Sequence, residues 1–249
     1  MKILANDGLS EKAIKTLEGA GFEVLTTKVA QNQLASFINE EQIDILLVRS
    51  ATQAKRDLID ACPALKLIGR GGVGMDNIDV VYAQEKGIKV INTPNASSHS
   101  VAELTFAHLF SGVRFLYDAN RNMPLEGDTR FNELKKDYAN GHELRGKTLG
   151  IIGLGRIGRA VATIALGLGM KVIAYDPEQQ EATITLSFFD GRSLDFVIKT
   201  ISKKEVLEEA DFITLHIPAQ KEAVIGEKEF QQMKDGVGIV NVARGGVID

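Results

Sequence analysis

Residues 148–158, TLGIIGLGRIG, decide the fold, because a short apolar run there leads directly into the pattern GxGxxG. A stretch of helical spacing follows, and a further apolar run ends at Asp176, 18 residues beyond Gly158. In that context Gly153, Gly155 and Gly158 permit a tight turn and let the backbone approach a pyrophosphate at a helix N-terminus. A carboxylate at the next strand end can accept hydrogen bonds from ribose hydroxyls. The stretch therefore predicts a dinucleotide site, and Asp176 favours NAD over NADP because it would repel a 2′-phosphate.

The first hundred residues repeat one unit, in which a β-branched apolar run is followed by a turn and a stretch of helical spacing. The expected strands are residues 2–5, 23–26, 43–49, 65–69 and 89–92. Strands that alternate with helices pair in parallel through right-handed crossovers. A helix expected from Ser98 to about Tyr117 forms the junction with a second series that starts near Lys147. The sequence predicts an α/β protein with two doubly wound parallel-sheet lobes, residues 1–97 and 98–249.

An insertion interrupts the second lobe at residues 183–200, where apolar residues alternate on both sides of Asp190-Gly191. Even-numbered residues carry the apolar face of both arms: Ile184, Leu186, Phe188, Leu194, Phe196 and Ile198. A two-residue loop would pair even positions with odd ones and split that face. A three-residue loop, 189–191, keeps the face intact and puts Gly191 where a left-handed conformation is needed. We expect a β-hairpin whose apolar face is covered by its own lobe or by a second subunit.

Composition limits the class of protein. The chain has 249 residues, of which 44% are hydrophobic and 25% charged, as in ordinary globular proteins. A net charge of −4 provides no field that would gather nucleic acid or anionic lipid. Cys62 is the single cysteine, no apolar run of about 18 residues occurs, and no export signal or metal-ligand spacing is present. We therefore expect a cytoplasmic protein with no bound metal and no nucleic-acid or membrane partner.

Further candidate ligand-binding residues follow the predicted strands, because ligands of open α/β sheets bind beyond the carboxyl ends of strands. Arg244 precedes two glycines and could clamp a carboxylate and polarise an adjacent carbonyl, although a surface salt bridge is the alternative. In the first lobe, Arg49 and Ser50 end one strand and residues 70–74, RGGVG, end the next. Their side chains and amides predict an anion cradle, although glycine turns at strand ends are common. His216 ends a strand of the second lobe and could line the cofactor pocket.

Six blocks span nearly the whole chain: residues 46–52 (LLVRSAT), 69–79 (GRGGVGMDNID), 90–103 (VINTPNASSHSVAE), 145–158 (RGKTLGIIGLGRIG), 215–218 (LHIP) and 241–249 (NVARGGVID). In content and order they resemble the D-isomer-specific 2-hydroxyacid dehydrogenases, and within that family the branch that acts on 3-phosphoglycerate. The resemblance implies a flavodoxin-like substrate lobe and a Rossmann lobe that binds NAD. It also implies a homo-oligomer, a dimer or larger, built mainly through the Rossmann lobes.

The resemblance assigns roles residue by residue. It implies contacts to the substrate's carboxylate or phosphate from Arg49, Ser50, the backbone of Gly72 and Val73, and Asn95. It implies cofactor contacts from Arg156, Ile157, Asp176, Ile217, Pro218, and the backbone of Val242 and Ala243, beside the three fingerprint glycines and His216. Arg244 matches the catalytic arginine and is also counted as a cofactor contact. Arg130, Lys135 or Lys136 could reach a substrate phosphate, but solvated helix charges are the simpler interpretation.

The implied activity is NAD-dependent oxidation of a small anionic D-2-hydroxy acid, with 3-phosphoglycerate converted to 3-phosphohydroxypyruvate in serine synthesis. In the family a glutamate and a histidine follow well downstream of the arginine, whereas this chain ends five residues after Arg244. The proton acceptor is therefore expected beyond Asp249, and the chain alone is expected to be inactive. Two alternatives stay open: a glyoxylate or hydroxypyruvate reductase, and an NAD-binding regulator without turnover.

Overall fold

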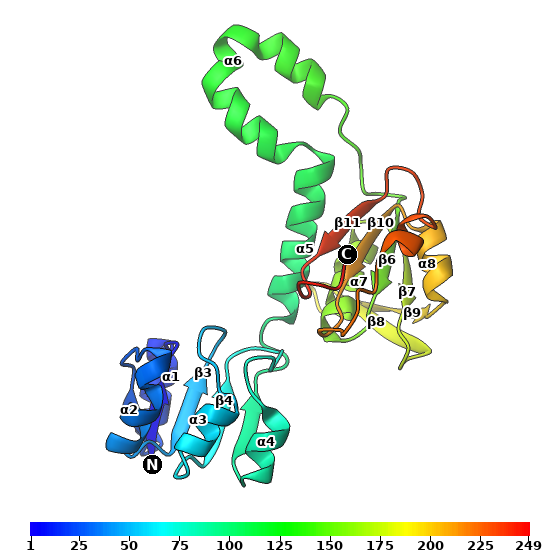
Figure 1. The fold of residues 1–249 in the computed structure, drawn as a ribbon. Coiled ribbons are helices and arrows are strands. Elements are labelled where there is room, and N and C mark those ends of the chain that lie inside the picture. Colours follow the sequence, from blue (N-terminus) through cyan, green and yellow to red (C-terminus); the bar gives the residue numbers. More distant parts are fainter. The chain divides into compact units, whose positions relative to one another are not determined.

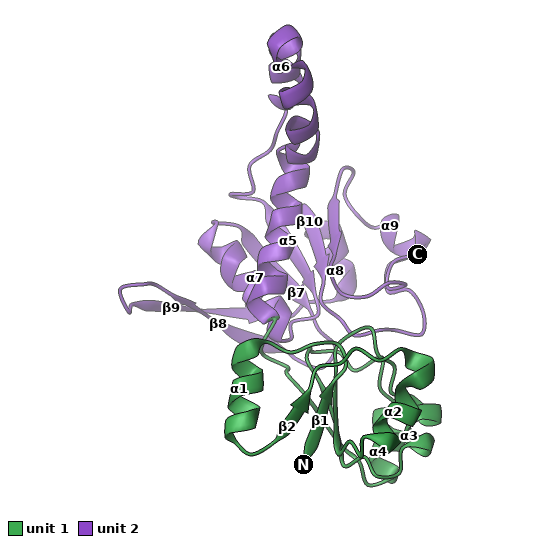
Figure 2. Cartoon of the chain, turned by 90° about the vertical axis from the view of Figure 1, so that its left-hand side faces the viewer, with its two compact units in different colours: residues 1–97 green, residues 98–249 purple.

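A computed structural model describes residues 1–249 and divides them into two compact units, residues 1–97 and residues 98–249 (Figure 2). Each unit has its own parallel sheet and its own core, and unit 2 carries an additional antiparallel hairpin. The predicted fold class, α/β with two parallel sheets and a β-hairpin, is confirmed. No helix combines the length and the apolar character that crossing a membrane would require.

Unit 1 is built around a five-stranded parallel sheet in the order β2-β1-β3-β4-β5 (Figure 1). Along the chain its elements are β1 (Lys2–Ala5), α1 (Glu11–Gly19), β2 (Glu23–Leu25), the 3₁₀ turn η1 (Gln31–Gln33), α2 (Leu34–Glu40), β3 (Ile45–Val48), α3 (Arg56–Ala61), β4 (Leu67–Arg70), α4 (Val80–Glu85) and β5 (Lys89–Asn92). All five expected strands are present; β1 and β5 have the expected bounds, and the ends of the other three differ by at most two residues. The strand order reverses between β1 and β3, so the carboxyl ends of these two strands flank the crevice where this fold binds ligands.

The core of unit 1 lies on one face of its sheet. Leu46 and Ile68 are fully buried there with Leu34 and Ile38 of α2 and Leu58 of α3. Alternate strand residues point to the other face. On that face Ile45 of β3 is still buried, but Ile91 is 44% exposed and Leu47 is only half-buried, so the sheet is open toward the carboxyl ends of β3 and β5.

Unit 2 is built around a four-stranded parallel sheet in the order β11-β10-β6-β7. Its elements are α5 (Ser98–Val113), α6 (Leu116–Tyr138), β6 (Thr148–Ile152), α7 (Arg156–Gly167), β7 (Lys171–Tyr175), β8 (Glu181–Ser187), β9 (Ser193–Lys199), α8 (Lys203–Glu209), β10 (Phe212–Leu215), α9 (Glu227–Phe230) and β11 (Gly238–Asn241). The order reverses between β6 and β10, which makes their carboxyl ends the switch point of this sheet. Leu149, Ile151, Val161 and Ala165 are fully buried between β6 and α7.

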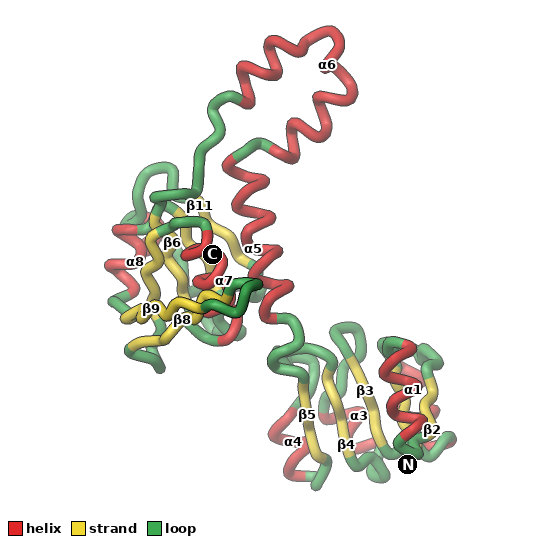
Figure 3. Tube along the Cα trace, turned by 180° about the vertical axis from the view of Figure 1, so that it is seen from behind, coloured by secondary structure: helices red, strands yellow, loops and turns green.

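Helix α5, which is expected to form the junction, is shorter than predicted. We expected it to run from Ser98 to about Tyr117, but α5 ends at Val113 because Phe115 has a left-handed backbone, with φ of 54°. The amide of His142 caps this end by donating to the carbonyl oxygen of Val113 at 2.9 Å. The polar segment that follows is helical as α6, which bends at Arg130 and forms the arch seen in Figure 3.

The hairpin has the register that the even-numbered apolar face requires. Ile184 pairs with Phe196 and Leu186 with Leu194 across β8 and β9. The loop has three residues, 189–191, and Gly191 is left-handed with φ of 84°, as predicted. The inner half of the face is covered by unit 2 itself, since Ile184 is buried in the core beside α7, and so is Ile198. Phe196, opposite Ile184, stays exposed, as do Phe188 and Leu194 nearer the tip. The outer half of the hairpin projects away from the rest of the unit (Figure 2).

Candidate functional site

Side chains that follow β1 and β3 build the switch point of unit 1. Asp7 accepts hydrogen bonds from the amide of Arg49 at 2.6 Å and from the hydroxyl of Thr52 at 2.7 Å. Asn77, which is 7% exposed, donates to the carbonyl oxygens of Arg49 and Thr52 and accepts from Nε of Arg70 at 2.9 Å. The backbone of residues 49–52 is therefore held from both sides by buried or half-buried polar side chains.

The Asp7 carboxyl is stabilised in its charged form. Burial alone would raise its pKa, but the hydrogen bonds from the Arg49 amide and from the hydroxyl and amide of Thr52 outweigh burial and hold the pKa below its ordinary value. Lys28 adds a favourable charge interaction. Asp7 is therefore charged at neutral pH, and an anion placed beside it needs the neighbouring cations Lys28 and Arg49 to offset the repulsion.

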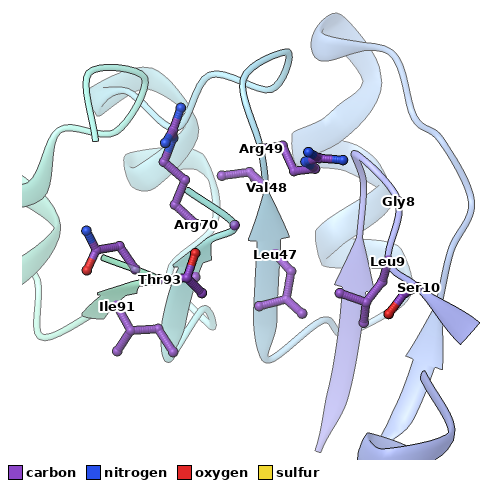
Figure 4. Close-up of a pocket in the computed structure, with 12 residues that line it drawn as sticks. Gly8, Leu9, Ser10, Leu47, Val48, Arg49, Arg70, Ile91 and Thr93 are labelled. Atoms are coloured by element: carbon purple, nitrogen blue, oxygen red, sulfur yellow. The ribbon is translucent and has the colours of Figure 1, made fainter. Parts of the chain in front are cut away.

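Arg49 stands between two cavities at this edge. One, of about 380 Å³, is lined by Arg49, Arg70, Ser10, Asn92 and Thr93 and continues over Leu47 and Ile91 on the open sheet face (Figure 4). The other, of about 370 Å³, lies toward β2 and is lined by Asn6, Asp7, Gly8, Thr26, Lys28, Arg49, Ser50 and Ala51. The side chain of Arg49 makes no hydrogen bond or salt bridge within the chain, and it is exposed, so its five N–H donors face these cavities.

Lys28 is a candidate that the sequence analysis missed. It lies in the same cavity as Arg49 and Ser50, three residues after the end of β2. Because β2 is parallel to β1 and β3, the rule that ligands bind beyond carboxyl ends of strands points to Lys28 as well. The signal was present, but β2 is a short edge strand and nothing in the sequence alone places it beside β1.

The other expected substrate residues lie along the same edge. The amide of Gly72 donates to the carbonyl oxygen of Arg70 at 3.0 Å, whereas the amide of Val73 donates to no group of the chain. The guanidinium of Arg70 covers Gly72, where any Cβ would collide with it. Asn95 is exposed in the loop after β5. The structure therefore keeps Val73 available to an anion and leaves Gly72 partly engaged.

The three fingerprint glycines of unit 2 differ in the space available for a side chain. Gly153 has φ of 95°, and a Cβ on it would lie 2.7 Å from the carbonyl oxygen of His216. A Cβ on Gly158 would collide with the carbonyl oxygen of Gly153. At Gly155, by contrast, a Cβ would meet nothing within 4 Å, and no side chain caps α7, which begins at the next residue. The first amides of α7 thus face open space and suit a pyrophosphate.

Asp176 lies where the ribose of a dinucleotide is expected, directly after β7. Its Oδ2 accepts from the amide of Leu154 at 2.8 Å, and its Oδ1 accepts from the amide of Glu178 at 2.9 Å. Gln179 was not anticipated, yet its Nε2 lies 3.4 Å from Asp176 Oδ2 and its Oε1 accepts from the guanidinium of Arg159. Arg156 and Ile157 occupy the first turn of α7 beside Gly155.

His216 follows β10 and packs beside the fingerprint turn. Its Nε2 lies 3.0 Å from the hydroxyl of Thr214, while its Nδ1 is buried without a partner. Burial lowers the pKa of His216 to about 4, so the ring is neutral at neutral pH. Ile217 also lies against Gly153, and Pro218 is exposed after it. These residues can wall a cofactor pocket, but a ring with this pKa is a poor proton acceptor.

The turn after β11 is stabilised by hydrogen bonds among residues 241–244. Asn241 accepts from the amide of Ala243 at 3.0 Å and donates to the carbonyl oxygen of Arg244 at 2.9 Å. Arg244 is half-buried, and its Nη1 donates to the carbonyl oxygen of Ala243 at 2.8 Å. Val242 is half-buried beside them. The segment therefore fixes Arg244 at the carboxyl edge of the sheet.

The four strand ends of unit 2 bring most of the expected cofactor residues into one row. Across the sheet the order is Asp176 after β7, the glycine turn after β6, His216 after β10 and Arg244 after β11. Adjacent strands are about 4.8 Å apart, so the row extends over about 14 Å. A ribose partner at one end, a pyrophosphate cradle next to it and an arginine at the other end fit an extended NAD molecule.

Comparison with known proteins agrees with this geometry. Residues 106–249 match the family described as D-isomer specific 2-hydroxyacid dehydrogenase, NAD binding domain. The chain is 42% identical to hydroxypyruvate reductase of Thermotoga maritima over 251 aligned positions, which include the whole chain and 76% of that protein. It is 41% identical to D-3-phosphoglycerate dehydrogenase of Methanocaldococcus jannaschii, of which it spans 45%. Among solved structures, NAD⁺-bound 3-phosphoglycerate dehydrogenase of Entamoeba histolytica matches the whole chain with a TM-score of 0.75 and 30% identity, over 74% of its own length.

Proposed function

Because the chain belongs to the D-isomer-specific 2-hydroxyacid dehydrogenase family and carries its NAD-binding domain, we propose that it serves to oxidise 3-phosphoglycerate to 3-phosphohydroxypyruvate. The observation that carries this choice of substrate is the cavity that Lys28 and Arg49 share at the β1/β3 switch point. A phosphate monoester carries close to two negative charges and three acceptor oxygens at neutral pH. Two cations beside Ser50 and Thr26 suit such a group better than a methyl or a hydroxymethyl group.

Unit 1 is proposed to hold the two anionic ends of the substrate. Arg49 presents a planar fork of N–H groups that matches the oxygens of a carboxylate or a phosphate. Lys28 adds a second charge toward β2, and Ser50 adds a hydroxyl. The available amide of Val73 provides a neutral donor at the end of β4, where a carboxylate can be oriented.

Unit 2 is proposed to hold the cofactor and to polarise the reacting oxygen. Bound NAD supplies the hydride acceptor. Asp176 accepts hydrogen bonds from the ribose hydroxyls, and the first amides of α7, including those of Arg156 and Ile157, hold the pyrophosphate. Arg244 donates to the oxygen on C2 and stabilises the negative charge that develops on it as the hydroxyl proton is removed, before C2 gives its hydride to the cofactor.

His216 is given no part in moving the hydroxyl proton. A general base works best with a pKa near the operating pH, and the pKa of this ring is about 4. The family resemblance assigns that task to a histidine well downstream of the arginine. We propose for His216 a packing role, in which a neutral ring walls the pocket beside Gly153.

A homo-oligomer formed through unit 2 is part of the proposal. Along α6 the side chains of Leu116, Leu125 and Phe131 are at least half exposed, which favours a surface that is covered in the assembled protein. Light scattering coupled to size-exclusion chromatography measures the mass of the particle directly. A monomeric mass at micromolar concentration would contradict this part of the proposal.

The experiment for the substrate compares the rate of NADH formation by the whole protein on 3-phosphoglycerate, D-glycerate and D-lactate. We expect kcat/KM for 3-phosphoglycerate to exceed that for D-glycerate at least tenfold, because each charge-assisted hydrogen bond contributes about 1.5–3 kcal/mol. Lys28→Met should reduce this preference while it leaves the D-glycerate rate unchanged. Equal or better turnover of D-glycerate by the parent protein would refute the choice of substrate.

A second candidate, hydroxypyruvate reduction, is favoured by one observation. The Thermotoga maritima relative with that name is 42% identical, and the chain covers more of it than of the phosphoglycerate dehydrogenases. Rapid NADH consumption with hydroxypyruvate, unaffected by Lys28→Met, would support it. NADH binding without turnover of any of these acids would instead support a regulator.

A further inference from the structure

The hairpin root reaches the part of unit 2 where the adenosine ribose is expected. Gln179 lies three residues after Asp176, where the chain leaves β7 and enters β8. Its Nε2 lies 3.4 Å from Asp176 Oδ2 and 3.4 Å from the carbonyl oxygen of Leu154 in the fingerprint turn. Its Oε1 accepts a hydrogen bond from Nη2 of Arg159. The side-chain amide of Gln179 therefore contacts the Asp176 carboxylate, the glycine turn and Arg159 of α7.

Arg159 is linked to Asp176 through the side chain of Gln179. Its Nε donates to the carbonyl oxygen of Leu154 at 3.2 Å, and its Nη2 donates to Gln179. An arginine near this position is what dinucleotide-binding sheets use to accommodate the 2′-phosphate of NADP. Here two of the five N–H donors are already used by the protein, so the guanidinium is drawn toward the fingerprint turn.

The hairpin holds Gln179 in place. The hydroxyl of Thr200, directly after β9, donates to the carbonyl oxygens of Gln179 at 2.7 Å and Gln180 at 3.0 Å. The amide of Thr200 donates to Gln180 as well, at 2.9 Å, and the amide of Ile201 donates to Ala174 of β7. Both ends of the inserted segment are thus tied to each other and to the sheet, which restricts the positions that the Gln179 side chain can take.

We propose that Gln179 is a positioning residue that, together with Asp176, sets the preference of this protein for NAD over NADP. Its carboxamide engages Arg159, which would otherwise pair with a 2′-phosphate, and its Nε2 steadies the Asp176 carboxylate toward the ribose hydroxyls. The inserted hairpin then contributes to cofactor choice through its root, while its tip takes no part. The inference rests on the proposed binding of NAD to unit 2.

The test measures the affinities of NAD⁺ and NADP⁺ for the whole protein by isothermal titration calorimetry. In Gln179→Ala we expect the ratio of NADP⁺ to NAD⁺ affinity to rise about tenfold, the equivalent of one hydrogen bond to a charged group. The double variant Gln179→Ala/Arg159→Ala should return the ratio to within a few fold of the parent value. Gln180→Ala is the matched control, because its side chain makes no hydrogen bond, and it should leave the ratio unchanged.

Thr200→Val provides a second variant that leaves Gln179 itself intact. It removes the hydroxyl that holds the Gln179 backbone, and we expect the same change of ratio with a smaller size. If Gln179 only supports the fold, both affinities fall together, and an unchanged ratio in Gln179→Ala would overturn the inference. A ratio that stays raised in the double variant would also overturn it. A parent protein that binds neither dinucleotide would refute the proposed function itself, whereas unchanged ratios with intact NAD⁺ binding would refute only the role of Gln179.

Discussion

In the proposed function the two sheets bind anions by different means, each at its own switch point. Unit 1 offers the charged side chains of Arg49 and Lys28. The backbone of Arg49 is held by Asp7, which accepts from its amide, and by Asn77, which donates to its carbonyl oxygen. Unit 2 uses backbone amides at the start of α7, and glycines bring the chain close enough. Unit 1 thus relies on full charges, and unit 2 on backbone dipoles.

This difference has a consequence for mutation. The edge of unit 2 is limited by space, because a single methyl group would occupy the place of a backbone oxygen. The edge of unit 1 is limited by charge and by hydrogen bonding, because Lys28 and Arg49 are exposed and the backbone of Arg49 is hydrogen-bonded on both sides. Substitutions at the edge of unit 2 should therefore act through stability, and substitutions at the edge of unit 1 through binding.

Gly158→Ala should have the largest effect, because the new Cβ would collide with the carbonyl oxygen of Gly153 and force α7 away from β6. We expect a loss of about 3 kcal/mol in the free energy of unfolding, measured by urea denaturation, as for other overpacked sites. Gly155→Ala is the matched control, since its Cβ would meet nothing within 4 Å. It should fold normally and yet bind NAD more weakly. Normal stability of Gly158→Ala would show that space does not limit this edge.

As the pH falls, the free energy of unfolding of unit 2 should decrease before that of unit 1. Burial lowers the pKa of His216 to about 4 from 6.5, so the unfolded chain takes up a proton that the folded ring resists. The stabilisation from the neutral ring is complete above pH 6.5 and is lost as the pH falls toward 4, by about 3 kcal/mol in total at 1.36 kcal/mol per unit. The Asp7 carboxyl has a lowered pKa, so its contribution is lost only as the pH falls below its ordinary value of 3.8.

Hydrogen exchange measured by mass spectrometry between pH 7 and pH 4 resolves the two units. Peptides of β6 and β10 should lose protection first, and His216→Gln should remove that loss of protection. Simultaneous loss in both units, or an unchanged pH dependence in His216→Gln, would show that the buried ring does not govern the acid response.

The patterns that depend on neighbouring residues could be predicted, and those that depend on distant ones could not. The strand–glycine–helix sequence at residues 148–158 and the even-numbered face of the hairpin are local, so both were predicted with their register. Lys28, Asn77 and Gln179 gain their roles only when parallel strands or the hairpin root bring them beside another segment. The left-handed Phe115 was missed for a different reason, since a phenylalanine disfavours that conformation and gives no signal of a helix end.

Arg49→Met should affect binding and leave folding unchanged. The Arg49 guanidinium has no partner in the chain, so its loss removes only the contact to the substrate anion, and KM for 3-phosphoglycerate should rise tenfold or more, equivalent to about 1.5–3 kcal/mol. Arg70→Met is the contrasting variant, because Arg70 donates to the buried Asn77. It should lower the melting temperature. Equal stability losses in both variants would break the distinction between a binding arginine and a supporting one.

The smallest effect of a substitution is expected at the hairpin tip, which lies at the carboxyl edge of neither parallel sheet. Phe189 is fully exposed, whereas Ile184 in the same hairpin is 2% exposed beside α7. Phe189→Ser should change the free energy of unfolding by less than about 0.5 kcal/mol and leave NAD affinity unchanged, as surface substitutions usually do. Ile184→Val, which removes one buried methylene group, should cost about 1 kcal/mol. The two values come from urea denaturation at low protein concentration, where a contact between copies through the tip contributes least. A loss of 1 kcal/mol or more in Phe189→Ser that grows with protein concentration would show that the tip is covered by a second subunit, and the hairpin would then contribute to assembly as well as to the edge of unit 2.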